Sequence, residues 1–223
     1  MLIPVSIFDV DRTLTKTPTY FAFLVFGAKR IAPWRRIFIP LVMAGMLAYK
    51  AGLISRKGLK QFMQARLLGP SISLYQANDL AAEFATLLMK NGLYPQAMDL
   101  LKREASDGRR VILATASHHF YIDTLAAELG IADVVATASV RRGEALTAKI
   151  DGENCYGEAK RDMVAALFMR EGLARDQLHI RFFSDDISDL PLFEWVDEAV
   201  AVNPSFALQA HAGVQGWPVL DWR

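Results

Sequence analysis

Two carboxylates stand at the end of the first apolar run of the chain, in the segment SIFDVDRTLT at residues 6–15. Asp9 follows the run directly, and Asp11 comes two residues later. A buried carboxylate is costly unless a partner balances its charge. So short a pattern also arises by chance, but ligands of open α/β sheets bind just beyond the carboxyl ends of the strands. The position of the pair therefore makes it a candidate site for a cation.

A second group of carboxylates follows a later apolar run, in HIRFFSDDISDLP at residues 179–191. Asp185, Asp186 and Asp189 would repel one another at one strand end unless a cation joins them. Carboxylate oxygens suit a hard cation, and Mg²⁺ is the simplest choice. A capped turn exposed to water is the alternative when this segment is considered alone.

Two further segments carry groups that could hold an anion. Thr115 and Ser117 close the apolar run of VILATASHH, where hydroxyls and free backbone amides either bind an oxyanion or cap the next helix. Lys160 in GEAKRDMV stands at the start of a predicted helix, where the helix dipole disfavours a positive charge. Lys160 is therefore either an ordinary surface lysine or the partner of a nearby anion.

The elements that must position these groups alternate between strands and helices from Leu93 onward. The predicted strands cover residues 111–114, 134–137, 179–183 and 199–202, and the predicted helices cover 96–106, 121–129, 160–169 and 190–195. This alternation indicates a doubly wound parallel sheet of the α/β class. The run from Leu2 to Phe8 is typical of a strand buried on both faces and belongs to the same sheet.

Between the first strand and the rest of the sheet, the pattern is helical. We expect helices over 18–27 and 33–51, a third capped by Ser55, and a fourth that begins with the capping-box pair Ser73 and Gln76. The chain is therefore predicted to have an α/β core made of residues 1–14 and 93–223. Residues 15–92 are predicted to form an inserted all-helical cap domain.

Charge is distributed unevenly along a chain whose formal net charge is only +1. The segment from Arg12 to Asn78 has 11 Lys and Arg and no Asp or Glu, which points to an anionic partner for the insertion. Within it, the apolar run from Ile37 to Tyr49 is shorter than the roughly 20 residues of a transmembrane helix. With Trp34 and basic residues at its ends, this run is either a buried helix or an interfacial helix at an anionic membrane surface.

Other sequence features bear on location and partners. The single cysteine, Cys155, excludes an internal disulfide and a cysteine-based zinc site, and it fits a reducing compartment. No secretory signal is visible, because the first apolar run stops at Asp9. We therefore expect a cytoplasmic protein, peripheral at the membrane if the interfacial interpretation holds. The basic segment lacks a basic-aromatic recognition motif, so no nucleic-acid partner is expected.

Taken in order, these segments resemble the four motifs of the haloacid dehalogenase superfamily of phosphatases. The resemblance spans essentially the whole chain and rests on Asp9-Val-Asp11-Arg-Thr13, Thr115, Lys160 and Asp185-x-x-x-Asp189. A helical cap between the first two motifs is similar to the subclass that includes phosphoserine phosphatases. The tail segments AVAVNPSFAL and GWPVL look like a subgroup that contains phosphatidylglycerophosphatases.

The chain departs from the family pattern at four positions. Arg12, Ser184 and Asp186 stand where many members have Gly, and Ser188 stands where Asn is common. Asp186 leaves two adjacent carboxylates as candidates for the metal. Asp185 is the predicted ligand, because its distance along the chain from the last motif aspartate matches the family spacing.

The resemblance implies a Mg²⁺-dependent phosphomonoester hydrolase that acts through an aspartyl-phosphate. Asp9 would attack phosphorus, and Asp11 would protonate the leaving oxygen and then take a proton from water. The implied metal ligands are Asp9, the backbone carbonyl of Asp11, and Asp185, with Asp189 outside the direct ligands or bound through water. The implied holders of the phosphate oxygens are Thr115, Ala116 and Lys160.

The substrate class stays open. The basic, apolar insertion favours an anionic lipid phosphate such as phosphatidylglycerophosphate, whereas a small soluble phosphomonoester such as phosphoserine is the alternative. A non-catalytic module that binds a membrane surface is a third hypothesis, against which the intact motif residues argue.

Overall fold

The first apolar run forms the centre of an eight-stranded sheet. In the computed structural model, which describes residues 2–222, β1 (Ile3–Phe8) lies between β3 (Arg110–His118) and β6 (Leu178–Ser184) and is parallel to both. The other strands are β2 (Ser71–Ser73), β4 (Asp133–Arg142), β5 (Ala145–Asp151), β7 (Glu198–Val202) and β8 (Val219–Leu220). Their order across the sheet is β2-β5-β4-β3-β1-β6-β7-β8. The six strands from β4 to β8 in this order run parallel, as the α/β prediction requires.

Helices cover both faces of the sheet. One apolar cluster joins Phe8 of β1 to residues of α5 (Pro95–Ser106) and α6 (His119–Glu128). The other joins Val5 and Ile7 to the helices α7 (Glu158–Arg170), α8 (Leu190–Phe193) and α9 (Phe206–Gln215). Val5 and Ile7 therefore enter one cluster and Phe8 the other, which explains why the sequence of β1 is mostly apolar.

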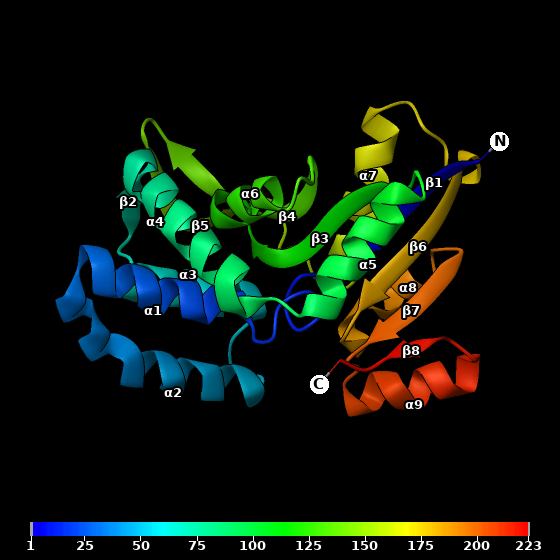
Figure 1. The fold of residues 1–223 in the computed structure, drawn as a ribbon. Coiled ribbons are helices and arrows are strands. Elements are labelled where there is room, and N and C mark those ends of the chain that lie inside the picture. The colour runs from blue at the N-terminus through cyan, green and yellow to red at the C-terminus, as the bar shows by residue number, and fades with distance from the viewer. Residues whose placement is uncertain (1, 223) are drawn as a thin grey trace.

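Between β1 and α5 the chain is mostly helical and lies at one end of the sheet, beside α6 (Figure 1). The helical elements of this segment are α1 (Thr19–Ile31), the 3₁₀-helix η1 (Pro33–Phe38), α2 (Ile39–Lys50), α3 (Arg56–Leu67), α4 (Leu74–Leu87) and the π-turn η2 (Leu88–Gly92). Ser55 caps α3 by accepting the Gly58 N–H at 3.0 Å, and Ser73 with Gln76 forms the capping box of α4. Both predicted caps are confirmed.

This segment differs from the prediction in two respects. The single helix expected over 33–51 is divided into η1 and α2, because Pro40 has no N–H to continue the hydrogen-bond ladder and instead occupies the first turn of a new helix. The segment is also not all-helical, since β2 pairs antiparallel with β5 at the edge of the sheet. A three-residue strand is too short to show a periodic pattern in the sequence.

Candidate functional site

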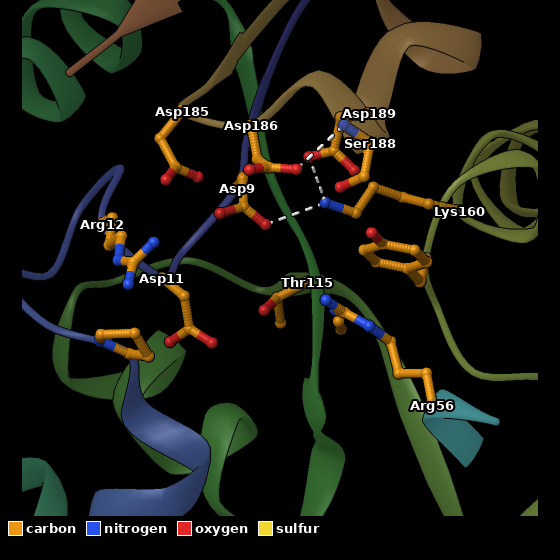
Figure 2. A pocket seen from close by; sticks show the side chains of 13 residues that line it. Asp9, Asp11, Arg12, Arg56, Thr115, Lys160, Asp185, Asp186, Ser188 and Asp189 are labelled. Carbon is orange, nitrogen blue, oxygen red and sulfur yellow. Dashed lines mark hydrogen bonds and ion pairs between the residues drawn. The ribbon is translucent and has the colours of Figure 1, made fainter. Parts of the chain in front are cut away.

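A pocket of about 280 Å³ opens at the carboxyl ends of β1, β3 and β6 (Figure 2). All seven predicted site residues are brought together in its lining. The lining residues are Asp9, Asp11, Arg12, Pro18, Arg56, Thr115, Ala116, Tyr156, Lys160, Asp185, Asp186, Ser188 and Asp189. The parallel strands place these side chains together, because their carboxyl ends meet at one edge.

Lys160 links two of the carboxylates at the base of the pocket. Its Nζ lies 2.8 Å from Asp9 Oδ1 and 2.6 Å from Asp189 Oδ2, and all three side chains are buried. Burial opposes the charge of Lys160, but Asp189 and Asp9 outweigh it and raise the pKa of Lys160. Lys160 is the third residue of α7, so the unfavourable helix position is compensated by two buried anions. It is not an ordinary surface lysine.

Asp9 remains short of balancing positive charge despite this ion pair. Burial, together with the negative charges of Asp189 and Asp11, raises the pKa of Asp9 to about 7 even though Lys160 acts in the opposite direction. Burial and the charges of Asp9 and Asp186 likewise raise the pKa of Asp185 to about 8. These two carboxylates lie side by side in Figure 2. At neutral pH the pair would therefore gain from either a proton or a cation.

Asp185 and Asp186 differ in exposure and in their contacts. Asp185 is buried, whereas Asp186 is only partly buried and accepts the Ser188 N–H at 2.9 Å as the cap of the 3₁₀-turn η4 (Ile187–Asp189). Ser184, which replaces a common glycine of the family, donates its hydroxyl to Asp189 Oδ2 at 2.6 Å. The other oxygen of that carboxylate, Oδ1, is buried and has no hydrogen-bond partner among the described residues.

Asp11 is held by donors from two other elements. Its Oδ1 accepts the backbone N–H and the hydroxyl of Thr19, at 2.8 and 2.6 Å, and its Oδ2 accepts the Ser117 hydroxyl at 3.1 Å. Because Thr19 is the first residue of α1, Asp11 also satisfies the free N-terminus of that helix. The carboxylate is thereby fixed at the boundary between the sheet and the helical segment.

Thr115 and Ala116 lie at an irregularity in β3, where its register with β4 shifts. The Ser117 N–H donates to Thr115 Oγ1 at 3.1 Å, which leaves the hydroxyl hydrogen of Thr115 free to point into the pocket. The Ala116 carbonyl accepts hydrogen bonds from Thr137 Oγ1 and from Nζ of Lys60. The peptide group between Ala116 and Ser117 is therefore held by side chains from two other elements, α3 and β4.

Lys60 is the buried lysine that the sequence did not reveal. It extends from α3, is 7% exposed, and also donates to Asn154 Oδ1 at 2.6 Å. Burial, with a smaller effect of Arg56, lowers the pKa of Lys60 to about 7. By sequence, Lys60 is one of the 11 basic residues between Arg12 and Asn78, but its ammonium contacts Ala116 and Asn154, which are distant along the chain.

Arg12, Arg56 and Tyr156 are among the lining residues of the pocket that were not predicted as site residues. Arg12 adopts a left-handed backbone conformation (φ 62°), which accounts for the glycine that many family members have at this position. Arg56 of α3 stacks its guanidinium 3.6 Å above the ring of Tyr156 and extends toward Thr115 in Figure 2. The basic composition of the insertion was the only sequence signal for Arg56.

The oxygen atoms of this pocket fit a hard cation, although its acidic side chains alone do not form a complete metal-binding cluster. Asp9 and Asp185 supply adjacent carboxylate oxygens with raised pKa values, and a buried oxygen of Asp189 lacks a partner. No group of three or more His, Cys, Asp or Glu side chains within residues 2–222 is arranged to hold a metal. The predicted set combines two carboxylates with a backbone carbonyl, so it is a different kind of site.

The chain is similar in sequence to proteins that are named as phosphatases. A probable phosphatase of Mycobacterium tuberculosis is 33% identical over 130 residues, which cover 58% of this chain and 44% of that protein. A phosphoserine phosphatase of the same organism is 28% identical over 144 residues, which cover 65% of this chain and 46% of that protein. The chain thus spans about half the length of these curated relatives.

Similarity to a solved structure and to a family extends over most of the chain. A protein of unknown function from Bordetella pertussis has a TM-score of 0.89 and 26% sequence identity, with 100% of both chains covered. The haloacid dehalogenase-like hydrolase family matches residues 7–194, which include every predicted site residue. The chain belongs to the haloacid dehalogenase-like hydrolases.

Proposed function

We propose that this protein is a Mg²⁺-dependent phosphomonoester hydrolase that acts through an aspartyl-phosphate on Asp9. The observation that carries the proposal is the group formed by Asp9, Lys160 and Asp189 beside Asp185, at the carboxyl end of the central strand. Relatives named as phosphatases support the same reaction class. The pocket combines a nucleophile, an acid–base group and donors for phosphate oxygens, which is what this reaction requires.

Each residue has a proposed role. Asp9 attacks phosphorus, and its Oδ2 is the oxygen that Lys160 does not contact. Asp11, held by Thr19 and Ser117, gives a proton to the leaving oxygen and then takes one from water. The proposed phosphate-binding groups are the hydroxyl of Thr115, the backbone of Ala116 and the ammonium of Lys160.

The proposed ligands of Mg²⁺ are the carboxylates of Asp9 and Asp185 and the backbone carbonyl of Asp11. The raised pKa values of the two carboxylates support this assignment, because a divalent cation would offset both the burial and the repulsion that raise them. When bound, Mg²⁺ would offset the charge between Asp9 and a phosphate and so favour the in-line approach. Asp189 holds Lys160 in place and lies outside the direct ligands.

We further propose that residues 15–92 act as a cap that sets the substrate, on a core of residues 1–14 and 93–223. Support comes from Arg56 and Pro18, which belong to this segment and line the same pocket as the core residues. Lys60 joins α3 to the end of β3 and thereby ties the proposed cap to the phosphate-binding peptide.

The outer side of the proposed cap favours a lipid phosphate and contact with an anionic membrane. Only Val42 of α2 is buried, while Ile37 is 70% exposed and Leu47 is 67% exposed. Arg36, in η1 just before this helix, and Lys50, at the end of the helix, are both exposed. Exposed apolar side chains with basic flanks are typical of peripheral membrane contact. Within residues 2–222, no helix is long and apolar enough to cross a bilayer.

A soluble phosphomonoester is the alternative substrate, and the phosphoserine phosphatase named among the relatives is the observation that favours it. A non-catalytic module would have the same pocket residues and would bind a ligand without hydrolysing it. Both alternatives to a lipid phosphatase are open to direct assay.

Hydrolysis of p-nitrophenyl phosphate tests the proposed function. We expect turnover with Mg²⁺, its loss after chelation with EDTA, and its recovery when excess Mg²⁺ is returned. A protein that remains folded by its melting curve but releases no nitrophenol with Mg²⁺ would favour the non-catalytic module.

A further inference from the structure

A second cavity, of about 220 Å³, adjoins the catalytic pocket on the side of the helical segment. The two cavities share Asp11, Pro18, Arg56 and Ala116 in their linings. Asp11, the proposed acid for the leaving oxygen, therefore borders both. A group attached to that oxygen would enter this second cavity.

The walls of the second cavity are mostly apolar. The side chains that line it beyond the shared residues come from α1, α2, α3 and β3; they are Tyr20, Phe21, Met46, Tyr49, Leu59, Lys60, Met63 and Ser117. Most are apolar or aromatic, and none is a carboxylate. We call this cavity the apolar chamber.

The polar atoms in the chamber wall already have partners. Nζ of Lys60 donates to Asn154 Oδ1 and to the Ala116 carbonyl. Tyr20 donates its hydroxyl to the Lys60 carbonyl at 3.0 Å, and Tyr49 accepts from Arg56 Nε at 3.2 Å. Few polar groups thus remain for an occupant, apart from the guanidinium of Arg56 at the boundary between the cavities.

We propose that the apolar chamber binds an alkyl or aryl part of the leaving group, an inference that rests on the proposed phosphatase function. The substrate is then a phosphomonoester of an apolar alcohol. An amino-acid phosphate would have to bury an ammonium and a carboxylate against this wall. The Arg56 guanidinium at the boundary is the one group described above that could pair with the carboxylate, and the ammonium would lose hydration against a mostly apolar wall. The chamber is smaller than the roughly 300–1,000 Å³ of pockets for drug-sized ligands. It therefore takes only the segment of the leaving group next to the ester oxygen.

A series of soluble substrates tests the proposal. Specificity constants (kcat/KM) are measured with Mg²⁺ for ethyl, butyl and hexyl phosphate, for phosphoserine, and for p-nitrophenyl phosphate as the general probe of turnover. We expect kcat/KM to rise roughly two- to fourfold for each added methylene until the chamber is filled, as burial of apolar surface predicts. Phosphoserine should be a poorer substrate than butyl phosphate.

Variants at Met46, which lines the chamber from α2, locate the effect. Met46→Trp fills the chamber and Met46→Gln makes its wall polar, so both should reduce the hexyl-to-ethyl ratio of kcat/KM at least fivefold. Met169→Gln, at a position on α7 that is 76% exposed, is the matched control and should keep the wild-type ratio. Melting curves establish that each variant is folded, and the second variant keeps the test valid if the first does not fold.

The outcomes separate the two proposals. Turnover of p-nitrophenyl phosphate with a hexyl-to-ethyl ratio near one, or with phosphoserine preferred over butyl phosphate, would overturn the chamber proposal and leave the hydrolase intact. No turnover of any substrate would overturn both. If the chain-length effect is observed, the last measurement is the rate of hydrolysis of phosphatidate in detergent micelles. A rate above that of hexyl phosphate assigns the apolar part to a lipid, and a lower rate assigns it to a soluble compound.

Discussion

At the scale of single residues, the site consists of charges that the fold would not keep for stability alone. Asp9, Asp185 and Asp189 are buried close together, and Lys160 is the positive charge that joins two of them. Buried ion pairs seldom repay their lost hydration, and an extra buried carboxylate only adds to the cost. Several destabilising buried charges in one place are characteristic of functional sites, where a bound ligand compensates for them.

The choice between two adjacent carboxylates can be tested at this scale. Asp185→Ala should raise the Mg²⁺ concentration needed for half-maximal activity at least tenfold, because it removes a proposed buried oxygen ligand. Asp186→Ala should leave that requirement nearly unchanged and cost about 1 kcal/mol of stability or less, as expected for the loss of a cap. Activity titrated with Mg²⁺ and melting curves provide the readouts. A larger metal defect in Asp186→Ala would mean that the assigned metal ligand is wrong by one residue.

At the scale of elements, α2 separates the apolar chamber from the outer surface. Met46 and Tyr49 line the chamber, while Met43 and Leu47 are exposed on the outside. This arrangement explains why the sequence of α2 is apolar without being amphipathic, and why the sequence alone could not decide between a buried and an interfacial helix. In the structure, one side of the helix lines the chamber and another side is exposed.

The proposed membrane contact by α2 predicts salt-dependent binding to anionic vesicles. Replacing Arg36 and Lys50 with Gln should weaken the affinity for such vesicles by up to roughly thirtyfold, since each basic residue near the surface contributes about 1 kcal/mol. Lys60, which the sequence grouped with these residues, is unsuitable for this test because it is buried. Hydrolysis of p-nitrophenyl phosphate should be unchanged.

The matched control removes two exposed basic residues from the core helix α5, as Lys102→Gln and Arg103→Gln. Its binding should equal that of the wild type. Wild-type protein that ignores anionic and zwitterionic vesicles alike at low salt would refute membrane contact and favour a soluble substrate.

Much of the site was predictable from sequence because its residues follow apolar strands. Asp9, Thr115 and Asp185 were located by position, since parallel strands bring their carboxyl ends together. Lys60 was not, because a lysine is exposed by default and its burial depends on Asn154 and Ala116, which are far away in sequence. Arg12 was identified only as a departure from a glycine, and its positive φ became evident in the structure.

At the scale of the whole molecule, the raised pKa values of Asp9 and Asp185 link stability to pH and to metal. Each carboxyl binds its proton more tightly in the folded protein than when unfolded, so the associated stability is present at low pH. It is lost as pH rises through about 7 for Asp9 and about 8 for Asp185. Metal-free protein should therefore lose this contribution between about pH 4 and pH 8, and Mg²⁺ should compensate for the loss.

Asp185→Asn isolates this effect from other groups that titrate. Burial lowers the pKa of His118 and Lys60, so these two groups raise the stability of the folded protein as pH rises. Both groups are present in the wild type and in the variant, so their effect cancels in the comparison. In EDTA, the melting temperature of the variant should increasingly exceed that of the wild type from pH 5 to pH 8. Mg²⁺ should raise the melting temperature of the wild type more than that of the variant. If the difference in melting temperature between the variant and the wild type does not vary with pH, the folded protein does not disfavour the charged form of Asp185.

The central claim is that Asp9 becomes phosphorylated during turnover, and trapping the aspartyl-phosphate tests it most directly. Protein quenched in acid during hydrolysis of p-nitrophenyl phosphate is treated with borohydride, which reduces an acyl phosphate to an alcohol, and is then mapped by peptide mass spectrometry. We predict that the side chain of Asp9 is converted to that of homoserine. Asp9→Asn should show neither this product nor turnover, yet should melt as a folded protein because the replacement is nearly isosteric. A reduced residue at Asp11 or Asp185 instead, or wild-type turnover in Asp9→Asn, would contradict the account.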